Sequence, residues 1–377
     1  MQTVSAHPNN IYVHIRSMYM HKHMQKNMQI PMHTYDYTFL ETAPVSVPIL
    51  NLTARIYALR EQTANALPDN AKLFDRLETQ AKIASVTSSN AIEGIVTTDA
   101  RISELAEGAL PLTHDEAEIA GYNDVLNLIH TEFEDMVFDE KSVLAMHKMM
   151  LAKSGAPDGG KYKSADNFIL EYSARGEKKI RFKPVPAKET KSAMKQLMLA
   201  YGEAKDNAAI NPLLLIPCVV LDFLCIHPFR DGNGRISRLI SLLLLYQCGF
   251  TAGRYSSLEA KIDAARELYY TGLKTSSAGW NENKNNYLPF IEFFLRMLYE
   301  SYLELSNTVA ENRAGSKSDR IEKAVLTALV PVSKAEICRS LPDVSPTTVE
   351  AVLGKLVREG RVIKSGAARS TKYFRAK

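Results

Sequence analysis

The sequence has few cysteines, and their spacing matches no metal or disulfide pattern. Four occur in 377 residues, with no Cys-x-x-Cys pair and no histidines grouped around them. This spacing argues against a zinc site and against a disulfide framework. Free thiols are typical of a reducing, cytoplasmic compartment, which we therefore expect. The four are Cys218, Cys225, Cys248 and Cys338.

Long hydrophobic segments are also missing. The longest apolar stretch, 213–226, contains Asp222 and is too short to span a membrane. The amino terminus has no apolar core of the kind that signal peptides carry. Neither a membrane span nor a membrane partner is therefore expected.

The composition is otherwise that of a globular protein, with 46% apolar and 23% charged residues. A chain of this length is expected to form two or three compact units. The net charge of +4 is unevenly spread, because residues 318–377 hold 12 basic and 6 acidic residues. The basic surplus therefore belongs to the C-terminal segment.

The first 33 residues differ from the rest. They hold six of the 13 methionines and five of the nine histidines, with no regular period. We expect a disordered leader over 1–33, with Met32 as an alternative start. His21 and His23 could instead bind a metal.

Apolar residues recur at spacings of three and four through most of the chain, which predicts a mainly α-helical fold. Residues 34–112 are expected to form an N-terminal helical region, with a turn at 68–70, a helix running towards Ser85 and a short element at 89–94. Residues 113–312 are expected to form the main body, followed by a linker at 314–318. The body's expected helices lie at 115–131, 139–152, 188 onward, 212–226, 233–247, 258–274 and 287–312.

One β-hairpin is expected within this helical body. Two apolar segments, 167–170 and 179–182, flank the polar, glycine-containing segment 173–178. Short apolar runs around such a polar turn are typical of a hairpin.

Residues 227–238 combine features that phosphate chemistry requires. Gly232 and Gly234 flank Asn233 where a helix is expected to begin. Glycines let the backbone approach an anion closely, and the free N–H groups at a helix start bind phosphate. The sequence therefore predicts a phosphate cradle here.

The charged side chains of this stretch fit the same chemistry. Arg235 and Arg238 lie three residues apart and so share a helix face, where two guanidinium groups suit a polyphosphate. Asp231 offers the kind of oxygen ligand that Mg²⁺ uses beside substrate phosphates. His227 can exchange a proton near neutral pH. Together they predict a site for phosphoryl-type transfer with a metal and a base.

Every defined position of 227–238 matches His-x-Phe-x-Asp/Glu-Gly-Asn-Gly-Arg-x-x-Arg, so the chain resembles the Fic family, over roughly residues 40–300. The resemblance implies a Fic-type helical bundle that transfers AMP from ATP, with Mg²⁺, to a Ser, Thr or Tyr hydroxyl of a target protein. It assigns the base to His227, the Mg²⁺ ligand to Asp231 and the fixing of the loop to Phe229. It assigns the α- and β-phosphates to Gly232, Asn233 and Gly234, the β-phosphate region to Arg235 and the γ-phosphate to Arg238.

Further segments extend the resemblance. Residues 89–94 resemble the inhibitory motif Ser/Thr-x-x-x-Glu-Gly/Asn, with Ser89 and Glu93 at its defined positions. This implies that Glu93 pairs with Arg238 in place of the γ-phosphate. The expected hairpin lies where the family has its flap, which orders the target segment by strand addition.

Two smaller similarities accompany these. Lys163 stands where the family pattern Gly-x-aromatic-Arg has its arginine, and this departure bears on a local contact only. Tyr269 and Tyr270 resemble a pair that lines the adenine and ribose side in relatives. Relatives can carry an asparagine seven residues later, where this chain has Ser277.

The C-terminal segment, 318–377, is expected to form three helices at 320–329, 333–340 and 346–359, then strands at 361–364 and 371–374. This order resembles a winged helix. Eight of the last 23 residues are basic, which suits phosphate contacts. The third helix offers Thr347, Thr348 and Glu350 near its start, a poor set for reading bases. A DNA partner, a protein partner and a homodimer stay open as alternatives.

The sequence as a whole predicts an autoinhibited protein adenylyltransferase. Two alternatives use the same site differently, namely removal of AMP and transfer of another phosphate-linked group. A third is a DNA-binding regulator whose body senses nucleotide. The target protein and the means by which inhibition by Glu93 is relieved stay open.

Overall fold

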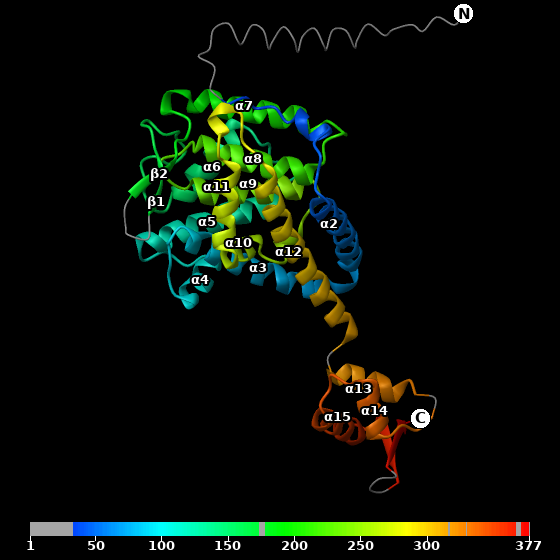
Figure 1. Ribbon diagram of the computed structural model, residues 1–377. Coiled ribbons are helices and arrows are strands. Elements are labelled where there is room, and N and C mark those ends of the chain that lie inside the picture. Colours follow the sequence, from blue (N-terminus) through cyan, green and yellow to red (C-terminus); the bar gives the residue numbers. More distant parts are fainter. Residues whose placement is uncertain (1–32, 173–177, 316, 329, 367–370, 377) are drawn as a thin grey trace, which may run out of the picture.

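The computed structural model describes residues 33–172, 178–315, 317–328, 330–366 and 371–376. Most of these residues are helical, which confirms the expected mainly α fold. They form a large helical body and a small C-terminal module that lies beyond the end of α12 (Figure 1). The predicted leader lies outside the described residues, apart from His33. Within the described ranges, no helix is both long and apolar enough to cross a membrane.

The helical body contains one two-stranded antiparallel sheet among its helices. Its first part comprises η1 (Thr38–Glu41), α2 (Val47–Ala66), η2 (Pro68–Asn70), α3 (Ala71–Ile92), α4 (Asp99–Ala106), α5 (His114–Glu132), α6 (Glu140–Leu151), β1 (Ile169–Tyr172) and β2 (Lys178–Phe182). Its second part comprises α7 (Ala187–Lys205), α8 (Pro212–Ile226), α9 (Asn233–Gln247), η3 (Ala252–Arg254), α10 (Leu258–Ala264), α11 (Arg266–Ser276), η4 (Trp280–Glu282) and α12 (Leu288–Ala314).

Three expectations about these elements were wrong. The helix expected to run only towards Ser85 continues as α3 to Ile92, because Ser85 and Ser89 are buried against neighbouring helices instead of marking a turn. The helix expected at 258–274 is broken at Ala265, where α10 packs on α3 and α11 packs on α12. The linker expected at 314–318 is shorter, because α12 runs to Ala314 and α13 begins at Lys317.

Helix α8 forms the centre of the body. Pro212 stands in its first turn, and the side chain of Asn211 caps it by accepting the N–H of Leu213 at 2.9 Å. Nearly all of its residues are buried, as expected for a helix that is apolar on every side. It packs against α7, α9 and α12, so the residue that follows it is held firmly in place.

One charged residue, Asp222, lies fully buried within α8. Its carboxylate accepts hydrogen bonds from Tyr37 Oη at 2.8 Å, Trp280 Nε1 at 2.7 Å and Tyr287 Oη at 2.8 Å. Burial nevertheless raises the pKa of Asp222 above its ordinary value. These bonds tie the segment before α2 and the turn at η4 to the central helix.

The description of the segment before α2 begins at His33, the last residue of the predicted leader. His33 is buried and stacks on Trp280, with 3.9 Å between the ring centroids. Its Nδ1 atom lies 2.8 Å from the carbonyl oxygen of Trp280. Contacts between residues about 250 positions apart leave no local signal in the sequence.

We expect that Tyr37→Phe destabilises the fold, because it removes one donor from the buried carboxylate of Asp222. The loss should be about 1 to 3 kcal/mol in the free energy of unfolding, measured by urea titration. Tyr35→Phe is the matched control, since the hydroxyl of Tyr35 is buried without a hydrogen-bond partner in the described structure. Equal losses for the two variants would contradict a special role for the bond to Asp222.

The C-terminal module has the three helices and the hairpin expected from the sequence. Its elements are α13 (Lys317–Leu326), α14 (Lys334–Ser340), α15 (Pro346–Arg358), β3 (Val362–Ser365) and β4 (Lys372–Arg375). They enclose a separate apolar core that includes Ile321, Ile337 and Leu353. Ser333 and Glu336 form a capping box at the start of α14. The likeness to a winged helix stays a prediction.

Much of the basic surplus of this module is paired with its own acidic side chains. Arg361 pairs with Glu322, and Lys372 lies 2.8 Å from Glu336. Lys355 lies 3.8 Å from Glu359. Arg369 and Lys377 of the predicted basic group lie outside the described residues. These pairs reduce the charge offered to a nucleic acid, so the module carries no specific observation in favour of DNA.

Candidate active site

The site begins with His227, the residue directly after α8. Its φ of 51° is left-handed, which is uncommon for a residue with a side chain. Its Nδ1 lies 3.3 Å from the carbonyl oxygen of Leu224. A carbonyl can only accept, so Nδ1 carries the proton and Nε2 keeps a free lone pair. The geometry therefore presents Nε2 as a proton acceptor.

The charge state of His227 fits this role. Burial is the main cause that lowers its pKa to about 4, and the positive charges of Lys163 and Arg181 add to the effect. At neutral pH the imidazole is therefore uncharged. An uncharged imidazole with a free nitrogen is a competent general base.

The loop after His227 is held by the side chain of Asn233. Its side chain accepts the N–H of Phe229 at 2.9 Å and donates to the carbonyl of Phe229 at 2.8 Å. The sequence assigned Asn233 to phosphate binding together with the glycines. Its buried side chain closes the loop, so the predicted phosphate contact would fall to its backbone N–H and stays a prediction.

His147, on α6, supports the same loop and was missed by the sequence analysis. Its ring stacks on Phe229 with 3.7 Å between centroids. Its Nδ1 accepts the N–H of Gly160 at 3.0 Å, and its Nε2 lies 3.1 Å from the carbonyl oxygen of Asp231. His147 stands 80 positions before His227, on a helix face that also suits a core residue, so no local pattern points to it.

Lys163 and Asn167 fasten the loop from the other side. Lys163 Nζ donates to the carbonyl of Ile226 at 3.1 Å and to Asn167 Oδ1 at 2.8 Å. The amide of Asn167 in turn donates to the carbonyl of Phe229 at 3.1 Å. Cationic side chains commonly cap the C-terminus of a helix by donating hydrogen bonds to its last carbonyl groups. The lysine at this position therefore helps to fix the backbone on both sides of His227.

The predicted phosphate cradle lies at the start of α9. Gly232 has a φ of 80° and precedes the helix as its N-cap. A Cβ atom on Gly234 would lie 2.1 Å from Glu93 Oε1. Glycine at 234 is therefore required for the close approach of Glu93 to the helix start.

Asp231 lies at the edge of this cradle. Its Oδ1 accepts the N–H of Gly232 at 2.7 Å, and 74% of its side chain is exposed. Among the residues described, no group of three or more His, Cys, Asp or Glu side chains could hold a metal by itself. One carboxylate beside substrate phosphates nevertheless fits the way Mg²⁺ is usually bound. The alternative metal ligands His21 and His23 lie outside the described residues.

Arg235 lies in a buried position on α9. Its side chain is only 1% exposed and lies 2.5 Å from Glu118 of α5, with Asp231 at 3.6 Å. It does not line the main cavity. Arg235 thus joins α9 to α5 in a buried ion pair, and its assignment to the β-phosphate region stays a prediction. Glu118 left no signal in the sequence because its partner is 117 positions away.

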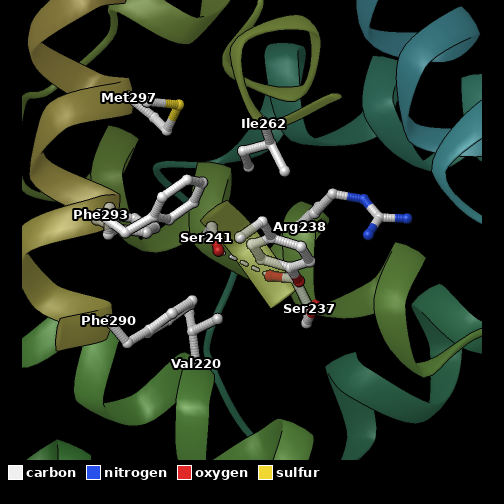
Figure 2. Close-up of a pocket in the computed structure, with 10 residues that line it drawn as sticks. Val220, Ser237, Arg238, Ser241, Ile262, Phe290, Phe293 and Met297 are labelled. Carbon is white, nitrogen blue, oxygen red and sulfur yellow. Dashed lines mark hydrogen bonds between the residues drawn. The ribbon is translucent and has the colours of Figure 1, made fainter. Parts of the chain in front are cut away.

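Arg238 lies where the inhibitory motif predicts. Its Nε donates to Ser89 Oγ at 2.8 Å, and its Nη2 donates to the carbonyl of Ser89 and to Glu93 Oε1, each at 2.8 Å. In Figure 2 its guanidinium extends away from the apolar side chains Phe290, Phe293 and Met297. The cavity that those side chains line measures only about 10 Å³.

Helix α3, which supplies Ser89 and Glu93, is itself anchored one turn earlier. Ser85 Oγ donates to Glu259 Oε2 at 2.7 Å, and Tyr122 Oη donates to Glu259 Oε1 at 3.1 Å. Glu259 is 1% exposed. This buried network holds α3 against α10 and α5, so Glu93 reaches Arg238 from a fixed support.

The main cavity has a volume of about 200 Å³ and is lined by several of the residues described above. His227, Gly234 and Glu93 share its wall with the tyrosine pair. Tyr269 is 4% exposed and Tyr270 is 44% exposed, so only the second offers much of its ring. The remaining lining residues come from the flap, α8 and α11 and are Ile169, Arg181, Phe182, Leu221, Leu224, Leu273 and Ser277.

Comparison with known proteins agrees with this geometry. The model of the Fic/DOC family matches residues 137–245, which include α8, the loop and most of α9. The fold is similar to a Fic family protein from Desulfovibrio desulfuricans, with a TM-score of 0.60 and 20% identity, covering 88% of this chain and 97% of that one. A Fic domain containing signaling protein from Bacteroides thetaiotaomicron gives a TM-score of 0.58 and 22% identity, covering 68% of this chain and 97% of that one. The chain therefore contains a domain of the Fic family.

Curated relatives include proteins named protein adenylyltransferase Fic. The one from Nematostella vectensis is 24% identical over 198 residues, which cover 49% of this chain and 42% of the relative. The one from Drosophila persimilis is 20% identical over 239 residues, covering 62% of this chain and 42% of the relative. The chain thus matches less than half the length of these relatives.

The buried histidines predict a loss of stability in acid. Burial is the main cause that lowers the pKa of His147 to about 4 from its ordinary value of 6.5. Between those values the unfolded chain binds more protons than the folded one, so the free energy of unfolding falls as the pH decreases through this range. His147→Gln should flatten this dependence by up to about 1.4 kcal/mol per pH unit. Urea titrations between pH 6.5 and 5 measure it, and identical slopes for both proteins would contradict the account.

Proposed function

We propose that this chain is a protein adenylyltransferase that transfers AMP from ATP to a Ser, Thr or Tyr hydroxyl of a target protein, and that its resting state is inhibited. The observation that carries the proposal is the shared cavity. It brings an uncharged His227, the glycine-flanked start of α9 and Glu93, which is the partner of Arg238, to one wall. The names of the curated relatives support the same reaction.

In the proposed reaction His227 Nε2 accepts the proton of the target hydroxyl. The hydroxyl oxygen forms a bond to the α-phosphorus of ATP while the bond from that phosphorus to the bridging oxygen breaks. The products are the AMP-modified side chain and pyrophosphate, and the proton on His227 passes to solvent. Neutral His227 is ready for this step because its pKa is low.

Asp231 is the residue that would hold Mg²⁺. Its exposed carboxylate lies next to the cradle, where one protein ligand can combine with phosphate oxygens. The ion would neutralise charge on the phosphates. Backbone N–H groups at the start of α9 would bind the phosphates themselves, since Gly232 and Gly234 allow close approach.

The flap formed by β1 and β2 is suited to hold the target. Exposed apolar side chains lie on or beside it, with Phe168 at 52%, Leu170 at 44% and Ile180 at 45% exposure. A two-stranded sheet has free edges that can accept a further strand. A lysine–glutamate pair, Lys274 to Glu171 at 2.6 Å, holds the flap to α11 beside the cavity.

Inhibition follows from competition for Arg238. The γ-phosphate that the sequence assigns to Arg238 would need the position of the Glu93 carboxylate, 2.8 Å from Nη2. A phosphate and a carboxylate cannot share that position without strong repulsion. ATP therefore binds in a non-reactive arrangement until Glu93 moves.

We expect that Glu93→Gly raises AMP transfer at least about 10-fold, equivalent to 1.4 kcal/mol, because it removes the competitor for Arg238. The measurement is incorporation of label from α-labelled ATP with Mg²⁺ into the protein itself and into added proteins. His227→Ala combined with Glu93→Gly should abolish the label. Labelling that persists without His227 would sink the catalytic assignment.

The chain offers a matched control for this variant. Glu107, like Glu93, is the C-cap of its helix and is followed by a glycine with positive φ. It makes no contact with Arg238. Glu107→Gly should therefore leave labelling at the wild-type level, and a similar rise in both variants would point to loosening of the fold instead.

Removal of AMP is a second candidate, favoured by the position of Glu93. Its carboxylate lines the cavity with His227 and is one third exposed, so it can accept a hydrogen bond from a water molecule. In that reaction Glu93→Gly would abolish release of AMP from a modified protein. Release that survives this substitution would exclude Glu93 as the positioning group.

A further inference from the structure

The main cavity has one permanently charged cation in its wall. Among its twelve described lining residues, this is Arg181 of β2. The Nη1 atom of Arg181 is buried and has no hydrogen-bond partner in the described protein. A buried donor without a partner is costly and uncommon, so an anion inside the cavity would satisfy it.

A β-bulge places Arg181 at this position. Phe182 pairs with Ile169 and Ile180 pairs with Leu170, so Arg181 is the extra residue of β2. Ile180 is 45% exposed whereas Phe182 is 9% exposed, although the two would face the same side of a regular strand. Bulges re-aim single side chains and are common beside active sites. Here the bulge turns a guanidinium into the cavity.

The two arginines of α9 are occupied in the resting arrangement. Arg235 is held by Glu118 at 2.5 Å, and Arg238 is held by Glu93 at 2.8 Å. Neither of them lines the main cavity. Arg181 is therefore the arginine that an anion entering this cavity would meet while Glu93 is in place.

The position of Arg181 indicates which phosphate it meets. Its charge acts on His227, although burial is the larger cause of the low pKa there. Both side chains line the same cavity. In the proposed reaction the base and the α-phosphate meet at the target hydroxyl, so a cation that shares this cavity with His227 is placed to reach the α-phosphate.

We infer that Arg181 binds the α-phosphate of the nucleotide, an inference that rests on the proposed function. The contact holds a nucleotide in the cavity even while Glu93 occupies Arg238. During transfer, the same guanidinium stabilises the negative charge on the oxygens of the α-phosphate. The site predicted from the sequence does not include Arg181, because this residue lies outside the motif at 227–238. Arg181 belongs to strand β2 of the flap, and the fold of the flap places it in the cavity wall.

The test measures binding of ATP, AMP and adenosine to the full chain by calorimetry with Mg²⁺. It compares the wild type with Arg181→Gln and with Lys179→Gln. Lys179 is an exposed cation on the same strand that does not line the cavity, so it controls for the charge of the flap. Arg181→Gln should weaken ATP and AMP alike by about 10-fold or more, as expected for loss of a charge-assisted hydrogen bond. Adenosine binding and the Lys179 variant should be unchanged.

Four results would overturn the inference. Unchanged affinities in the Arg181→Gln variant would show that Arg181 does not contact the nucleotide. An equal loss of affinity for adenosine would show that Arg181 only shapes the cavity. A loss confined to ATP would place Arg181 at an outer phosphate. If the wild-type chain binds none of the three ligands, the proposed function is contradicted as well. If ligands bind but the affinity does not depend on Arg181, the proposed function still stands.

Discussion

The buried guanidinium of Arg238 is the group on which the resting arrangement of the site depends. It is 3% exposed, and a cation so deeply buried needs hydrogen-bonding partners. Helix α3 supplies partners for Nε and Nη2 through the side chain and carbonyl of Ser89 and the carboxylate of Glu93, whereas Nη1 has no hydrogen-bond partner among the described residues. The absence of a side chain at Gly234 lets that carboxylate reach the helix start. In the proposed inhibition, Glu93 therefore pairs with the same cation that the γ-phosphate of ATP would need.

The rest of the site follows from the junction between α8 and α9. The tightly packed α8 fixes the position of His227, whose left-handed backbone turns the chain out of the helix. Side chains remote in sequence then fix the loop, with Asn167 on one side and His147 on the other. His227, the start of α9 and the pair of Glu93 with Arg238 are therefore each held in place by packing or hydrogen bonds.

The sequence was sufficient for the parts of the site that depend on local spacing. The mainly helical fold, the hairpin, the motif that carries His227 and the contact between Glu93 and Arg238 all follow from short patterns. The side-chain partners of Asn233 and Arg235 were not predicted, because a motif does not reveal them. Arg181 was missed because a bulge, set by the pairing of two strands, decides where it points.

In the proposed reaction the adenylyl group of ATP, and not its terminal phosphate, is transferred to the target protein. The most direct measurement compares the Glu93→Gly protein incubated with ATP labelled at the α-phosphate and with ATP labelled at the γ-phosphate. The account predicts protein-bound label from the α-position alone, with pyrophosphate released in equal amount. Protein-bound label from the γ-position would contradict it, since that result requires transfer of a phosphoryl group from the opposite end of the nucleotide.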